Sequence, residues 1–285
     1  MSQSILYVVA TPIGNLGDIT LRALEILKSV DVIAAEDTRH TSGLLSHLGI
    51  TKKLIAVHQH NEQQSAESLV ARLQAGESIA LVTDAGTPAV SDPGAVVVAA
   101  VRAAGFKIVP IPGASAVVAA LSASGIVENG FTFIGFLPAS GGARKKVLQA
   151  LALHPYTLVF YEAPHRIMES IADIAASFGA ERNIVIAREL TKTFETIHKC
   201  SLADAVKWLE NDSNQQRGEF VLLLEAAPIK AFEGIAEDEK RVLKALLADL
   251  PLKQAVKLTA EITGAKKNMI YEFALTLKSI ELKND

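Results

Sequence analysis

Residues 79–88, with the sequence IALVTDAGTP, decide the fold of this chain. The four apolar residues at 79–82 predict a short strand that is buried on both faces. The next six residues, 83–88, are rich in turn-forming side chains and carry one acid, Asp84. A buried strand that ends in such a loop is typical of an open parallel sheet, in which ligands bind outside the carboxyl ends of the strands.

The same combination of strand and loop recurs three more times in the first 112 residues. The other strand candidates cover residues 5–10, 31–35 and 107–109, and the loops that follow them cover 11–15, 36–39 and 110–116. Helical spacing is found between the strands, at residues 20–27, 62–74 and 95–104. This alternation predicts βαβ units and a mostly parallel sheet, whose four loops meet at one edge. We interpret them as a small-molecule site, although ordinary turn chemistry accounts for any single loop.

The alternating pattern continues over residues 113–226. Strand candidates cover 131–135, 157–161, 184–187 and 220–225, and helical patterns cover 145–153, 166–177 and 202–210. A threonine-rich stretch at 191–200 is expected to add an extended hairpin arm. Pro228 and Gly234 break the periodicity and indicate a linker.

The last 50 residues contain three amphipathic helical patterns. Pro251 separates the first two, and Gly264 ends the second. Three short helices with a glycine turn before the last predict a helix-turn-helix, with a docking or dimerisation bundle as the alternative. Five lysines against two glutamates between residues 251 and 278 favour nucleic acid, with Lys266 and Lys267 where the last helix begins. We therefore expect three domains: residues 1–112, 113–228 and 235–285.

Composition excludes several classes of protein. The 285 residues are 49% hydrophobic with a formal net charge of −3, so the chain has no general basic field for coating nucleic acid. Cys200 is the only cysteine, which fits a reducing compartment. No targeting segment and no apolar stretch of membrane-spanning length occurs, so the protein is expected to be cytoplasmic. The Walker A, HExxH and GxGxxG motifs are missing, and no metal site is expected.

Taken together, these loops resemble those of the tetrapyrrole methylase superfamily of S-adenosylmethionine-dependent methyltransferases. The resemblance spans residues 5–226 and is strongest to a branch that methylates the ribose 2′-hydroxyl of small-subunit ribosomal RNA. The stretches that carry it are VATPIGNLGD (9–18), AEDTR (35–39), TDAGTP (83–88) with SDPG (91–94), PGASA (112–116) and FYEAPHR (160–166). Other members usually carry GxGPG after the first strand and a GGDP-like turn later. The departures here favour the RNA-modifying branch over a tetrapyrrole substrate.

The resemblance implies two α/β domains with the cofactor in the cleft between them, a C-terminal helix-turn-helix appendage and a homodimer. It implies methyl transfer from S-adenosylmethionine to a cytidine in the decoding region of 16S ribosomal RNA, free or within the small ribosomal subunit. By similarity, the cofactor contacts fall on Pro12, Thr83, Asp84, Ala85, Pro88, Ser115, Ala116, Tyr161, Glu162, Ala187 and Leu190.

A ribose hydroxyl is a weak nucleophile, so a proton acceptor assists its methylation. The Glu36 and Asp37 pair is the favoured candidate, with Arg39 orienting a phosphate or the carboxylates; each acid has a structural role as its alternative. The candidate RNA contacts are the basic residues Arg144, Lys145, Lys146, Arg166, Lys266 and Lys267. A methylase of a small tetrapyrrole-like metabolite and a ligand-sensing helix-turn-helix regulator remain the alternative functions.

Overall fold

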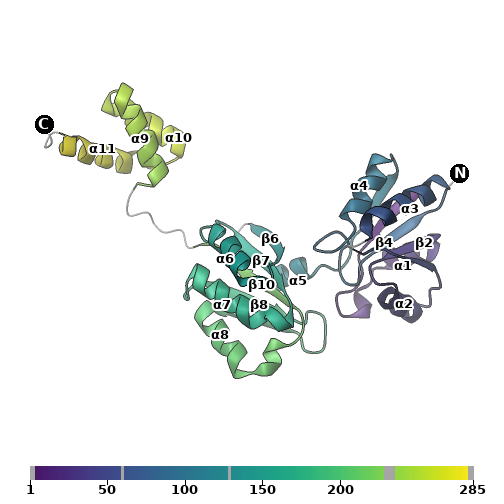
Figure 1. The fold of residues 1–285 in the computed structure, drawn as a ribbon. Helices are drawn as coiled ribbons and strands as arrows, with labels where there is room; N and C mark the ends of the chain where they lie inside the picture. Colours follow the sequence, from purple (N-terminus) through teal and green to yellow (C-terminus); the bar gives the residue numbers. More distant parts are fainter. Residues whose placement is uncertain (1–3, 59–60, 128–129, 228–234, 282–285) are drawn as a thin grey trace. The chain divides into compact units, whose positions relative to one another are not determined.

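The computed structural model describes residues 4–58, 61–127, 130–227 and 235–281. The chain divides into two compact units, residues 1–227 and residues 228–285. Both predicted sheets belong to the first unit, and the predicted helical appendage forms the second (Figure 1). The finer division of the first unit at residue 112 stays a prediction.

The first sheet has five strands, all parallel, as the alternating pattern predicts. Their order is β3-β2-β4-β1-β5. The strands are β1 (Ile5–Val9), β2 (Val32–Ala35), β3 (Lys53–Ala56), β4 (Ile79–Val82) and β5 (Lys107–Ile111). Both β2 and β4 are buried along their whole length, which explains their unbroken apolar sequences.

Helices cover both faces of this sheet. One face packs against α1 (Leu21–Ser29) and α2 (Thr38–His47), and the other against α3 (Glu62–Gln74) and α4 (Ala95–Ala103). The sequence did not predict α2, whose first turn lies in the expected loop 36–39. A short 3-10 helix, η1 (Leu16–Asp18), follows β1.

The second sheet is mixed, so the parallel pattern does not extend into it. Its order is β6-β7-β10-β8-β9, and only the β6–β7 pair is parallel. The strands are β6 (Phe131–Phe136), β7 (Thr157–Glu162), β8 (Asn183–Arg188), β9 (Thr196–Ser201) and β10 (Phe220–Leu224). The predicted hairpin arm is confirmed, because β9 returns antiparallel to β8.

Helices also cover the second sheet on both faces. The larger core lies against α6 (Gly141–Ala150), α7 (Ile167–Phe178) and α8 (Leu202–Asn211). The opposite face packs on α5 (Ala116–Ala123). Two 3-10 helices, η2 (Pro164–Arg166) and η3 (Ser213–Gln216), lie in the connections after β7 and after α8.

The second unit contains the three predicted helices, α9 (Glu237–Asp249), α10 (Leu252–Thr263) and α11 (Lys267–Glu281). Gly264 ends α10 in the left-handed conformation with φ +74°, as expected for a glycine cap. The core of the unit includes Leu243, Val256 and Ile270, one from each helix. Most of the predicted linker, residues 228–234, lies outside the described residues.

No helix in the described ranges is long and apolar enough to cross a membrane. Among the same residues, no group of three or more His, Cys, Asp or Glu side chains is arranged to hold a metal ion.

Candidate functional site

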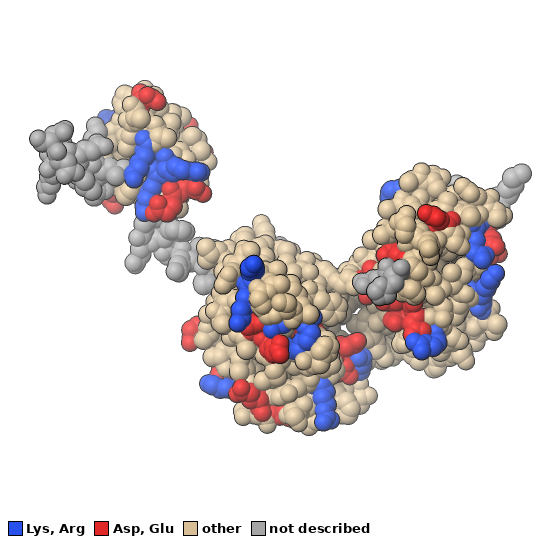
Figure 2. Space-filling model, in the orientation of Figure 1, with Lys and Arg blue, Asp and Glu red and all other residues tan. Residues whose placement is uncertain are grey.

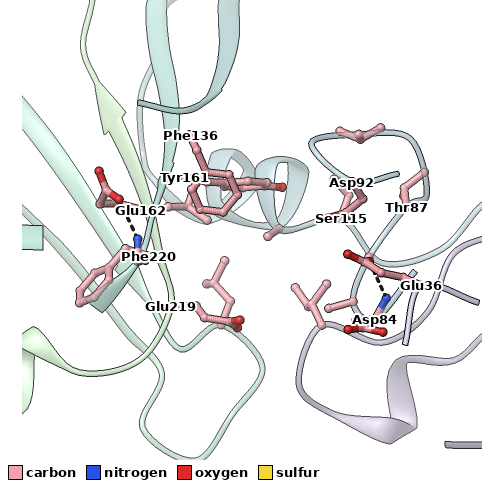
Figure 3. A pocket seen from close by; sticks show the side chains of 18 of the residues that line it. Glu36, Asp84, Thr87, Asp92, Ser115, Phe136, Tyr161, Glu162, Glu219 and Phe220 are labelled. Carbon is pink, nitrogen blue, oxygen red and sulfur yellow. Dashed lines mark hydrogen bonds between the residues drawn. The ribbon is translucent and has the colours of Figure 1, made fainter. Parts of the chain in front are cut away.

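A cavity of about 340 Å³ lies in the first unit, and loops from both sheets line it (Figure 3). Its size is in the range of small-molecule sites. The wall from the first half of the chain consists of Ile13, Glu36, Asp84, Ala85, Gly86, Thr87, Val90, Asp92, Ser115 and Ala116. The wall from the second half consists of Phe136, Tyr161, Glu162, Ala163, Pro164, Leu190, Glu219, Phe220 and Val221.

Two acids lie just beyond neighbouring parallel strands: Glu36 directly follows β2, and Asp84 is the second residue after β4. The hydroxyl of Thr83 donates to Glu36 Oε2 at 2.5 Å, and the backbone N–H of Asp84 donates to the same oxygen at 3.4 Å. Thr11 pairs with Gly86 in an isolated bridge that ties the loop after β1 to the loop after β4. The predicted edge of the first sheet therefore forms one connected wall.

Burial raises the pKa of Asp84 above its usual value, and the nearby carboxylates of Glu36 and Asp37 act in the same direction. The backbone N–H of Asp37 donates to Asp84 Oδ1 at 3.1 Å, which opposes this shift only in part. Asp92 comes from the next loop. Burial raises its pKa to about 6, and Glu36 and Asp84 add to the effect. The acids of this wall thus repel one another in a partly desolvated cavity.

The opposite wall is largely aromatic and apolar. The ring of Tyr161 packs edge-on against Phe136, with centroids 5.5 Å apart. Its hydroxyl points across the cavity toward Asp92 and Ser115 (Figure 3). Burial raises the pKa of Tyr161, so the phenol is neutral at physiological pH and can donate a hydrogen bond.

Glu162 lines the cavity but is committed to structural contacts. It is 2% exposed, and its Oε2 accepts from the Ser170 hydroxyl at 2.5 Å. Its Oε1 lies 3.3 Å from Nε of Arg166, at the end of η2. Arg166 also donates to the carbonyls of Leu137 and Pro138 at 2.5 and 3.1 Å, so it braces this wall.

A second hollow of about 320 Å³ lies beside the first and shares Asp84 with it. Pro12, Leu16, Arg39 and His40 are among its lining residues. The Arg39 guanidinium forms two hydrogen bonds to the Asp37 carboxylate, at 2.7 and 3.1 Å, yet 90% of its side chain is exposed.

Comparison with known proteins decides the family. The model of the Tetrapyrrole (Corrin/Porphyrin) Methylases matches residues 5–206. A second model, of the RsmI C-terminal HTH domain, matches residues 233–278. The chain belongs to the tetrapyrrole methylase family. Members transfer a methyl group from S-adenosylmethionine, so the chain is an S-adenosylmethionine-dependent methyltransferase.

The chain is similar to proteins named ribosomal RNA small subunit methyltransferase I. The protein from Escherichia coli O157:H7 is 52% identical over 96% of this chain and 96% of its own. The protein from Pseudomonas aeruginosa is 52% identical over 96% of this chain and 98% of its own. Among solved structures, diphthine synthase aligns with a TM-score of 0.62 at 18% identity, over 78% of this chain and 90% of its own. The methyltransferase CobJ aligns with a TM-score of 0.60 at 20% identity, over 79% of this chain and 95% of its own. At these identities the two structures support the fold alone.

Most residues predicted to contact the cofactor of this methylase line the larger cavity. Those that do are Asp84, Ala85, Ser115, Ala116, Tyr161, Glu162 and Leu190. Pro12 lines the second hollow, whereas Thr83, Pro88 and Ala187 line neither. Thr83 is 2% exposed and reaches the site through Glu36, and Ala187 is fully buried in the core under α5.

The predicted catalytic residues separate in the structure. Glu36 lines the larger cavity, Arg39 lines the second hollow, and Asp37 lines neither. Asp37 instead caps α2 by accepting from the Arg39 N–H at 2.8 Å. Hydrogen bonds from Arg39 hold the pKa of Asp37 well below its usual range, which makes this carboxylate a poor proton acceptor.

The predicted RNA contacts include one clear correction. Arg144 is 2% exposed and bonded to Asp173 and Glu169 of α7 at 2.7 and 3.3 Å, so it is not available to a phosphate. Arg166 is largely buried and braces the cavity wall. The other four predicted contacts, Lys145, Lys146, Lys266 and Lys267, are exposed. On the second unit, Lys and Arg side chains gather on one face beside acidic ones (Figure 2).

Sequence reasoning missed parts of the cavity. Asp92 belongs to the SDPG motif at residues 91–94, but its apolar surroundings and acidic neighbours are distant in sequence and are brought to it by the fold. Glu219 and Phe220 follow Gly218, whose φ of +86° marks a turn before β10. The rule of loops after strand ends does not find them, because they lie at or just before the start of β10, which the antiparallel pairing places beside the end of β7.

The cavity fits S-adenosylmethionine on its own features. The cofactor carries a positive sulfonium and a positive amino group, and the cavity presents acids with raised pKa values, which a cation would stabilise in their charged form. Apolar side chains such as Ile13, Leu190 and Val221 suit an adenine ring.

Proposed function

We propose that the protein methylates the ribose 2′-hydroxyl of a cytidine in the decoding region of 16S ribosomal RNA. The 52% identity to ribosomal RNA small subunit methyltransferases I over nearly the whole chain carries this proposal. The C-terminal match supports it, because residues 233–278 match a model of the RsmI C-terminal HTH domain, outside the tetrapyrrole methylase match at residues 5–206.

In this function the larger cavity holds the cofactor and admits the ribose hydroxyl of the target nucleotide, and the second hollow receives the adjoining RNA backbone. Asp84 forms part of both walls, so the two ligands would meet beside it. When bound, S-adenosylmethionine supplies an activated methyl carbon, and the protein contributes alignment and a proton acceptor. The exposed Arg39 guanidinium suits a backbone phosphate at the second hollow.

RNA would be held through separate basic patches, in keeping with the net charge of −3. Lys145 and Lys146 on α6 and the Lys266 and Lys267 pair before and at the start of α11 are exposed cations suited to phosphates. An unstacked target base needs an aromatic partner, and the half-exposed Phe136 at the cavity rim offers one.

We further infer a homodimer in the cytoplasm, where small ribosomal subunits are found. The exposed apolar side chains Phe131 and Tyr156 at the start of β6 and before β7 support self-association. Sedimentation equilibrium on the full chain tests this assembly, and a monomer at micromolar concentration would contradict it.

Transfer of tritiated methyl groups tests the function. The full-length protein is incubated with labelled S-adenosylmethionine and, separately, with small ribosomal subunits, free 16S RNA and uroporphyrinogen. We expect label in alkali-resistant dinucleotides of the RNA, because a 2′-O-methyl group blocks alkaline cleavage. The two RNA arms distinguish free RNA from the assembled subunit.

Two other outcomes would contradict the proposal. Label only in the tetrapyrrole would indicate a small-molecule methylase, and cofactor binding without transfer to any substrate would indicate a ligand sensor.

Glu36→Gln removes an acid of the cavity and should reduce transfer. Asp249→Asn, an exposed change near the end of α9, serves as the matched control.

A further inference from the structure

Asp92 lies in the loop between β4 and α4, and the backbone of this loop is strained just before it. Ala89 and Ser91 have φ values of 66° and 65°, a conformation that side chains disfavour. Such residues persist only where the surroundings fix them, and they concentrate at functional sites. Val90 and Asp92, which alternate with them along the chain, both line the cavity.

Contacts on both sides hold this loop in place. Glu62 of α3 accepts from the N–H groups of Gly94 and Val96 at 2.7 and 2.9 Å, which anchors the start of α4. Across the cavity, β6 bulges at Gly135, whose φ is +78°. A Cβ at Gly135 would lie 2.8 Å from the Ser91 hydroxyl, so the glycine makes room for the residue before Asp92. The position of Asp92 is therefore set by the fold.

The acids around the cavity differ in what already binds them. Glu36 accepts the Thr83 hydroxyl and an N–H, and Asp84 accepts an N–H from Asp37. Among the described residues, Asp92 has the Thr83 hydroxyl as its side-chain hydrogen-bond partner, and it shares that hydroxyl with Glu36. In the described part of the chain, no ion pair involves Asp92.

We propose that the carboxylate of Asp92 accepts the proton of the substrate hydroxyl during methyl transfer. This rests on the proposed function. The hydroxyl oxygen bonds to the methyl carbon as the carbon–sulfur bond breaks, the sulfonium becomes a neutral thioether, and the hydroxyl proton passes to a carboxylate oxygen of Asp92. The carboxylic acid then loses this proton to water.

The groups that face Asp92 support this role. They are Glu36 after β2, Asp84 after β4 and Tyr161 on β7, and none of them is a cation. Burial and the two carboxylates raise the pKa of Asp92 to about 6, and a pKa near neutrality suits a general base. Asp37, one of the pair of acids favoured by the sequence, is held in its charged form by Arg39 and is a much weaker base.

Single-turnover methylation of small ribosomal subunits tests the proposal with Asp92→Asn, Asp92→Glu and the control Asp249→Asn. We expect Asp92→Asn to slow transfer by roughly 10²–10⁴-fold at saturating cofactor, and Asp92→Glu to recover part of the rate. The affinity for S-adenosylmethionine, measured by calorimetry, should fall by far less than the rate, because Glu36 and Asp84 remain as acids of the same wall. The fall in wild-type rate toward acid pH should be lost in Asp92→Asn.

Two readouts do not depend on activity. Carboxyl ¹³C titration, assigned by difference from Asp92→Asn, should give a pKa near 6. An acid whose folded pKa is raised loses stability as pH rises from its unfolded value to its folded one. Asp92→Asn should therefore raise the thermal midpoint above pH 6 and leave it unchanged near pH 4.

Several outcomes would overturn the proposal. A wild-type rate in Asp92→Asn, or a carboxyl pKa near 4, removes Asp92 as the acceptor. A loss of cofactor affinity with a normal rate at saturation would make Asp92 a cofactor ligand instead. If the wild-type protein itself transfers no label to RNA, the proposed function fails and this proposal with it.

Discussion

Arg144→Ala should destabilise the first unit without a direct effect on RNA. The side chain is 3% exposed and bonds to Asp173 at 2.7 Å and to the exposed Glu169 at 3.3 Å. Removing one member of a buried ion pair costs about 3–5 kcal/mol, because the remaining charge is left without its partner. The side chain of Asp173 is 13% exposed, and it has a second partner, Lys145, at 3.4 Å. The loss of unfolding free energy should therefore lie near the lower end of this range, at about 3 kcal/mol.

Thermal unfolding measures this loss. In a unit of this size, 1 kcal/mol shifts the midpoint by about 2–4 °C, so Arg144→Ala should lower it by roughly 6–12 °C. The transition of the first unit is identified as the one that S-adenosylmethionine raises, because the cofactor binds the folded state. Lys146→Ala is the matched control on the same helix. Its side chain is exposed, so its midpoint should stay within about 1 °C of the wild type.

RNA binding shows whether Arg144 on α6 is a buried structural residue or a phosphate contact. Folded Arg144→Ala protein, measured well below its midpoint, should bind small subunits as the wild type does, whereas Lys146→Ala should bind more weakly. An unchanged midpoint together with weaker RNA binding in Arg144→Ala would refute the buried-pair reasoning and restore Arg144 as a phosphate contact.

Two further predictions concern the second unit and the cavity rim. Reversing Lys266 and Lys267 to Glu should weaken binding to small subunits and reduce the slope of log affinity against log salt by roughly 1.5–2, whereas an unchanged slope would assign these helices to packing. Gly218→Ala should lower the urea midpoint by an amount equivalent to about 1–3 kcal/mol, because its φ is +86° and an added Cβ would collide with Glu189. Gly142→Ala, which adds a Cβ in open space on α6, is the control and should be neutral or slightly stabilising.

The first sheet could be predicted because its buried strands are unbroken apolar runs between clear turn signals. The strand that was missed, β3, is an edge strand with only partly buried side chains, so its sequence, KLIA, carries a weak pattern. Helix α2 was missed because TRHTSGLLSH is polar and contains a glycine. The antiparallel pairs of the second sheet lie outside what periodicity can report, since strand direction depends on how the chain returns.

The location of the site could be predicted from the sequence, but the contacts and pKa values of its residues could be predicted only in part. Parallel topology brings Glu36 and Asp84 together, and that follows from strand order alone. Arg144 and Lys145 are adjacent basic residues in the sequence, yet only Arg144 is buried between α6 and α7, whereas the side chain of Lys145 stays 58% exposed. Neither such a difference nor the raised pKa of Asp92 can be found without tertiary neighbours.

The cavity also suggests how charge and turnover are coupled. Glu36, Asp84 and Asp92 share one partly buried wall, and the raised pKa values of the two aspartates mean that the protein ionises them at a cost. A cation in the cavity reduces that cost, so affinity for the positively charged S-adenosylmethionine should increase as pH rises through about 6. The product, S-adenosylhomocysteine, has lost the sulfonium charge, and the same wall should hold it less tightly. The acids that strain the empty protein would then favour binding of the methyl donor and release of the spent one.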